Sequence, residues 1–162
     1  MSPSALGLYF GLMALGYMLG NFLSGRYTVQ VGLDAMMLVG GAVSCVAILA
    51  AIGFFASGVT HPLAFFGSIS FVGVGNGLLL PSANAGLVSV RPHLAGSASG
   101  LGGALMIGGG ALLSAVTGAL LGPGTGPWPL LWMMLASTAA GFATTIYVIR
   151  VRRSAGPAGD DA

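Results

Sequence analysis

Five long apolar stretches, each free of charged side chains, constrain the fold of this chain more than any other feature. A helix that crosses a membrane needs roughly 20 mainly apolar residues, and each stretch has about that length. Strands of a membrane barrel would instead alternate apolar and polar residues over about ten positions. The pattern therefore predicts an all-α, polytopic membrane protein with five transmembrane helices, near residues 5–23, 35–56, 63–90, 94–121 and 129–149.

Composition supports this prediction and excludes several classes of protein. Only 5% of the residues are charged, whereas soluble domains carry about 25%. We therefore expect most of the surface to contact the lipid bilayer as its partner. A net charge of +2 is too small for a nucleic-acid-binding surface. Cys45 is the single cysteine, and no Cys/His cluster predicts a metal or another cofactor. Catalytic and phosphate-binding motifs are also missing, so we expect no enzyme and no catalytic residues.

The arginines predict the direction of the helices. They fall only in alternate links and after the last apolar stretch, whereas the links near 57–62 and 122–127 are uncharged. Positive charge is retained in the cytoplasm, so the C-terminus is expected inside and the N-terminus outside a bacterial inner (plasma) membrane. The side predicted to be cytoplasmic carries Arg26, Arg91, Arg150, Arg152 and Arg153.

Residues 1–153 are expected to form one five-helix transmembrane domain. Residues 154–162 are rich in Gly, Pro and Asp and are expected to form a disordered cytoplasmic tail. An odd number of spans with an exported N-terminus is unusual for a freestanding membrane protein. We therefore expect the chain to continue a longer one, with further N-terminal helices as its partner.

Small residues four apart mark the places where membrane helices pack, because lipid gives apolar side chains no reason to associate. The fourth stretch is richest in them, and helix packing is predicted at Gly96, Gly100, Gly108 and Gly110. The first and third stretches share the pattern. We therefore expect the first, third and fourth helices to be central, and the second and fifth to face lipid.

Polar side chains within apolar stretches suggest a candidate cavity. Asn76 and Asn84 flank Pro81, and a proline-loosened helix with amides suits a cavity wall or a gate. Hydrogen bonds between helices are the alternative role for the two amides. The first stretch adds three residues four apart on one side of a helix, and the fourth adds a flexible Met. The predicted substrate cavity therefore comprises Tyr9, Met13, Tyr17, Asn76, Asn84 and Met106. Alternatively, Tyr9 anchors the interface and Met13 and Met106 pack helices.

Three strings of residues resemble a known family of transporters. Residues 8–26 (LYFGLMALGYMLGNFLSGR) resemble the eighth helix of the Bcr/CflA drug-resistance efflux proteins of the major facilitator superfamily. Residues 80–86 (LPSANAG) resemble the end of its tenth helix, and residues 91–104 (RPHLAGSASGLGGA) resemble the loop and eleventh helix that follow. The resemblance implies helices eight to twelve of a twelve-helix fold, a partial C-terminal half. The acidic proton-coupling residues would lie in the absent half.

The resemblance also implies a cytoplasmic gate loop, carried by Gly20, Arg26, Gly32 and Asp34. The parent motif has an Asp just before its first basic residue, where this chain has Gly25. We therefore expect Arg26 to pair with Asp34 or with backbone carbonyls. Anchoring by positive charge is the plainer alternative for Arg26.

Two functions remain open from the sequence. The first is part of a multidrug efflux transporter, a drug:proton antiporter for small hydrophobic drug-like substrates, inactive as this chain alone. The second is a freestanding small membrane protein that scaffolds or assembles others. The lack of ionisable groups within the spans favours neither.

Overall fold

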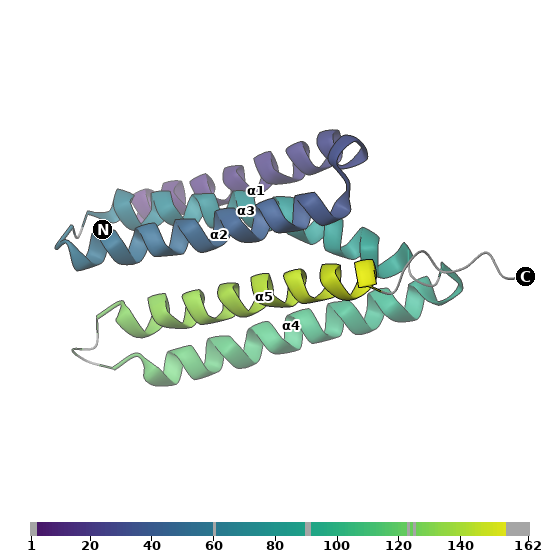
Figure 1. The fold of residues 1–162 in the computed structure, drawn as a ribbon. Helices are drawn as coiled ribbons and strands as arrows, with labels where there is room; N and C mark the ends of the chain where they lie inside the picture. The colour runs from purple at the N-terminus through teal and green to yellow at the C-terminus, as the bar shows by residue number, and fades with distance from the viewer. Residues whose placement is uncertain (1–2, 60, 90–91, 123, 125, 155–162) are drawn as a thin grey trace, which may run out of the picture.

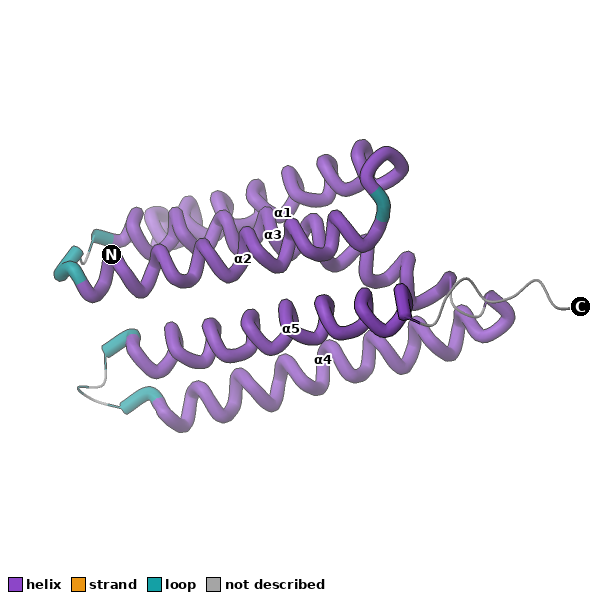
Figure 2. The backbone as a smooth tube through the Cα atoms, viewed as in Figure 1, coloured by secondary structure: helices purple, strands orange, loops and turns teal. Residues whose placement is uncertain are grey.

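The computed structural model describes residues 3–59, 61–89, 92–122, 124 and 126–154. These contain five long helices, α1 (Pro3–Val31), α2 (Leu33–Ala56), α3 (Pro62–Ser89), α4 (Ala95–Leu120) and α5 (Trp128–Ser154), and a short 3-10 helix η1 (Pro92–Leu94). Figure 2 shows helix almost throughout the described chain and no strand within it. All five long helices are long and apolar enough to cross a membrane, which confirms the predicted all-α polytopic fold.

Consecutive helices run in opposite directions, as short links between spans require. Figure 1 shows the ends of α1, α3 and α5 at the same end of the molecule as the starts of α2 and α4. Arg26, Arg152 and Arg153 belong to this end, whereas Trp128 begins α5 at the other. Arg91 and residues 155–162 lie outside the described residues, and Ser154 of the predicted tail is the last residue of α5.

Helix α1 is longer than predicted. It does not end at Leu23 but continues to Val31, because residues 24–31 contain no proline and no residue with positive φ. The break falls at a single residue, Gly32, whose φ of 86° places it in a region that side chains with a Cβ avoid. The segment predicted to link the first two helices is therefore almost entirely helical.

Helix α3 is the centre of the bundle, and α1 packs against it along close backbone contacts. Gly16 and Gly20 of α1 face Gly73 and Gly77 of α3. A Cβ atom at Gly73 would lie 2.8 Å from the Met13 carbonyl oxygen, and one at Gly77 would lie 2.5 Å from the Tyr17 carbonyl oxygen. Glycine is needed here because the two backbones touch, as in membrane helix pairs with small residues four apart.

Helix α2 packs on another side of α3, and the expectation that α2 faces lipid is wrong. A Cβ atom at Gly40 would lie 2.5 Å from the Gly75 carbonyl oxygen, so these backbones also touch. Among the five helices α2 has the largest buried share of its apolar window, 44%, against 28% in α3 and 6% in α4. The core beside it contains Ala47, Ile48 and Val72, with Met134 and Leu135 of α5 packed against them.

Helix α4 is peripheral within this chain, contrary to the expectation that it is central. Of its residues only Thr117 is buried. The four glycines predicted to pack helices, Gly96, Gly100, Gly108 and Gly110, have no atom of another helix within 4 Å of an added Cβ. The reason is the arrangement of the bundle: α1 lies against α3 and makes no contact with α4, which touches α3 and α5 only lightly.

Candidate functional site

Two of the six predicted cavity residues meet in a groove between α3 and α4. Asn84 of α3 and Met106 of α4 line this groove, which has a volume of about 250 Å³. The remaining lining residues are Leu87, Ser99, Gly102 and Gly103. The groove therefore combines an amide and a hydroxyl with two flexible apolar side chains.

The hairpin of α3, η1 and α4 positions these side chains. Gly102 of α4 faces Leu87 of α3, since an added Cβ atom would lie 2.9 Å from Cδ2 at the end of the Leu87 side chain. The Asn84 amide forms no hydrogen bond with any described residue, so its donors and acceptor are open to a bound molecule. Met106 is 56% exposed and can adjust its shape to a ligand.

The three predicted residues of α1 lie on the other side of α3. The Tyr9 ring stacks on Phe66, with ring centroids 4.7 Å apart. Met13 is half-buried against α3, and Tyr17 is 40% exposed. Asn76 is exposed on α3 between Gly75 and Gly77. Because α1 does not contact α4, the structure does not bring the three α1 residues into the groove of Asn84 and Met106, and Asn76 is not among the residues that line it.

The hydrogen bond between helices comes from serines that the sequence reasoning missed. Ser24 Oγ of α1 and Ser82 Oγ of α3 lie 3.3 Å apart, and both side chains are buried. Ser82 also donates to the Leu78 carbonyl, and Thr28 Oγ1 lies 3.3 Å from Ser24 Oγ. Neither Asn76 nor Asn84 forms such a bond within the described chain. The available signal was Ser82 itself, because a small polar side chain within an apolar stretch is suited to a hydrogen bond between membrane helices.

The predicted gate loop is not a loop, and its predicted ion pair is wrong. Gly20 and Arg26 lie within α1, so only Gly32 of the four residues lies between helices. Asp34 pairs with Arg152 of α5, with Oδ1 and Nη1 3.0 Å apart. Arg26 is exposed and pairs with no described residue. Because α1 continues past Arg26 for more than a turn, this side chain is carried away from the start of α2.

A cleft of about 390 Å³ surrounds the Asp34–Arg152 pair, where α1 ends, α2 begins and α5 ends. It is lined by Val31, Gly32, Leu33, Asp34, Ala35, Leu38, Arg152 and Arg153. Both charged and apolar side chains contribute, which distinguishes this cleft from the groove between α3 and α4.

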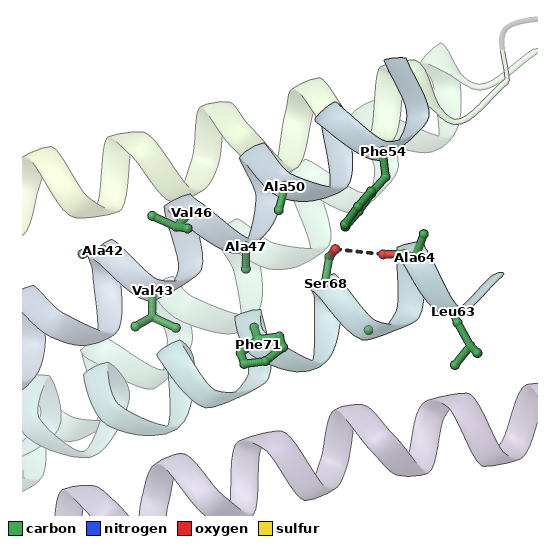
Figure 3. Close-up of a pocket in the computed structure, with 11 residues that line it drawn as sticks. Ala42, Val43, Val46, Ala47, Ala50, Phe54, Leu63, Ala64, Ser68 and Phe71 are labelled. Carbon is green, nitrogen blue, oxygen red and sulfur yellow. Dashed lines mark hydrogen bonds between the residues drawn. The ribbon is translucent and has the colours of Figure 1, made fainter. Parts of the chain in front are cut away.

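A further groove, of about 790 Å³, lies between α2 and α3 and contains none of the predicted residues. Figure 3 shows its single side-chain hydroxyl, on Ser68, directed at the Ala64 carbonyl, to which it donates at 2.8 Å. With that hydroxyl occupied, the walls offer apolar contacts only, which suits a lipid chain. The lining residues are Ala42, Val43, Val46, Ala47, Ala50, Phe54, Leu63, Ala64, Gly67, Ser68 and Phe71. The sequence signal for this groove was a row of apolar residues four apart on one side of α2, Ala42, Val46 and Ala50.

Comparisons with protein-family models, with curated proteins and with solved structures found no significant match to this chain. The resemblance to the Bcr/CflA family thus rests on the three strings of residues alone.

Proposed function

We propose that this chain is part of a Bcr/CflA-type multidrug efflux transporter of the major facilitator superfamily, in which it lines one side of the path for small hydrophobic drug-like molecules. The observation that carries the proposal is the groove between α3 and α4. Its residues Asn84, Ser99 and Gly102 come from two of the strings that resemble the family, residues 80–86 and 91–104. The groove suited to binding a ligand therefore lies in the same part of the chain as the strings that resemble the family.

The groove has the chemistry of a tolerant binding surface. Leu87 and Met106 supply soft apolar contact, and the Asn84 amide, which bonds to no described residue, supplies a polar point that can orient a ligand. The larger groove between α2 and α3 fits this role less well, because its only hydroxyl is already engaged within its own helix.

The exposed α4 supports a role within a larger assembly. Apolar side chains gain nothing by leaving lipid for protein, so small residues four apart on an open helix are suited to contact with another helix. Gly100 and Gly108 provide such positions, with no described residue of another helix against them. No carboxylate occurs between Asp34 and Asp160, so in this proposal the acidic groups for proton coupling come from other helices. We place the transporter in the bacterial inner membrane with the C-terminus in the cytoplasm.

A chimera tests this function. The chain is fused behind helices one to seven of a Bcr/CflA transporter, and efflux of a fluorescent dye is measured in a strain without its own pumps. We expect efflux from the chimera and none from the chain alone, because alternating access rocks one half against the other. Within the chimera, Asn84→Leu and Met106→Ala should reduce efflux several-fold, whereas Leu105→Ala, exposed beside the groove, should not.

The alternative, a membrane scaffold, would use the same open face of α4. It predicts an inactive chimera, correctly inserted, and recovery of the isolated chain in a stable complex with another membrane protein. That pair of results, or drug resistance conferred by the isolated chain, would overturn the proposed function.

A further inference from the structure

The cleft at the ends of α1, α2 and α5 has an excess of positive charge. Arg152 and Arg153 both line it, against the single carboxylate of Asp34. Arg152 is bound to that carboxylate, whereas Arg153 is exposed and makes no ion pair with any described residue. One guanidinium therefore has no ion-pair partner among the described residues beside a cavity of about 390 Å³.

The position of the cleft matches the level of lipid headgroups. It lies where α2 begins and α5 ends, and both helices are long and apolar enough to span the membrane. Val31, Leu33 and Leu38 form apolar walls next to the charged side chains. A ligand that fits must therefore join an anionic group to an apolar body.

These features together identify the class of ligand. Arginine binds phosphate oxygens through charge-assisted hydrogen bonds, and basic pockets between membrane helices are known to hold anionic headgroups. The start of α2 contributes little, because the Asp34 carboxylate in its first turn offsets the field of the uncapped helix end. The cavity and the Arg153 guanidinium therefore define the site.

We propose that this cleft binds the headgroup phosphate of an anionic phospholipid, with Arg153 as its main contact and Arg152 shared between the phosphate and Asp34. Apolar walls of the cleft would hold the glycerol and the first part of an acyl chain. The proposal does not depend on a transport function.

Native mass spectrometry of the full chain, released from detergent micelles, measures binding of phosphatidylglycerol, phosphatidylcholine and inorganic phosphate. We expect one phosphatidylglycerol to bind in preference to phosphatidylcholine. Arg153→Gln should weaken phosphatidylglycerol binding about fivefold. Arg26→Gln is the matched control, since it removes an exposed arginine from the same end but outside the cleft, and it should leave binding unchanged.

Asp34→Asn should change the affinity for phosphatidylglycerol in the opposite direction. This substitution releases Arg152 from its carboxylate, so phosphatidylglycerol should bind about fivefold more tightly. If Arg26→Gln and Arg153→Gln weakened phosphatidylglycerol binding equally, the lipid would bind through general surface charge, and the proposed site would be overturned. Weaker binding in Asp34→Asn, equal binding of phosphatidylcholine, or equally strong binding of inorganic phosphate would also overturn it.

Discussion

Gly20 in α1 lies so close to α3 that one added methyl group would meet the Val74 carbonyl and the Gly77 Cα atom, the latter at 2.9 Å. Gly11, on the same helix, has no neighbour within 4 Å of such a methyl group. Replacing glycine by alanine inside a helix usually stabilises it by roughly 1 kcal/mol. Forcing an extra carbon into a packed contact costs about 1–3 kcal/mol.

We therefore expect Gly20→Ala to lower the free energy of unfolding and Gly11→Ala to raise it or leave it unchanged. Titration of the purified chain from mild detergent into SDS, followed by circular dichroism, measures both. Equal effects of the two substitutions would mean that α1 and α3 do not approach as closely as the structure shows.

Two buried serines differ in their hydrogen bonding, and this difference predicts different costs of removal. Ser44 Oγ has no hydrogen-bond partner within the described chain, whereas Ser82 Oγ bonds to Ser24 and to the Leu78 carbonyl. An unpaired buried hydroxyl costs free energy, so Ser44→Ala should be neutral or stabilising. Ser82→Ala should cost about 1 kcal/mol, because Ser24 then loses its partner across the helices. The same SDS titration compares them, and a larger loss from Ser44→Ala would contradict the assigned pairing.

At the scale of elements, α4 is the helix whose role depends most on what surrounds it. Within the described part of the chain Gly100 and Gly108 meet no other helix, whereas Gly102 faces Leu87 of α3. In the isolated chain, Gly100→Leu and Gly108→Leu should leave the free energy of unfolding unchanged or raise it by up to about 1 kcal/mol, because leucine favours a helix more than glycine does. Gly102→Leu should be less favourable than either, because the new side chain must displace the end of Leu87.

In the chimeric transporter, the same Gly100→Leu and Gly108→Leu substitutions should sharply reduce dye efflux, because leucine would hold another helix away from α4. Full efflux in both variants would show that α4 faces lipid in the assembled protein as well. The isolated-chain measurements keep this result separate from any failure to fold.

At the scale of the whole molecule, the alternation of the helices makes a prediction about orientation. Alkaline phosphatase fused at Gly58 or Gly124 should be active, since phosphatase folds only outside the cytoplasm, and a fluorescent protein fused at Pro92 should be bright. The arginines at the ends of α1 and α5 are the physical reason, since positive loops stay in the cytoplasm. Strong phosphatase activity at Pro92 would reverse the orientation.

The number, length and alternation of the helices could be predicted from the sequence, because they depend on local properties. A run of apolar residues long enough to span a bilayer must form a helix, since lipid cannot satisfy free backbone groups. Turn residues then set most of the breaks. The exception is the end of α1: Ser24-Gly25 resembles a turn, but only Gly32 has the positive φ that ends the helix.

Packing could not be predicted in the same way. Glycines four apart occur in α1, α3 and α4 alike, yet only those of α1 and α3 meet, because contact depends on the shape of both surfaces and not on one pattern. Asp34 and Arg152 are 118 residues apart, so only the tertiary structure could select this pair over Arg26. Hydropathy alone thus determined what the elements are, and the fit between helix surfaces determined which of them touch.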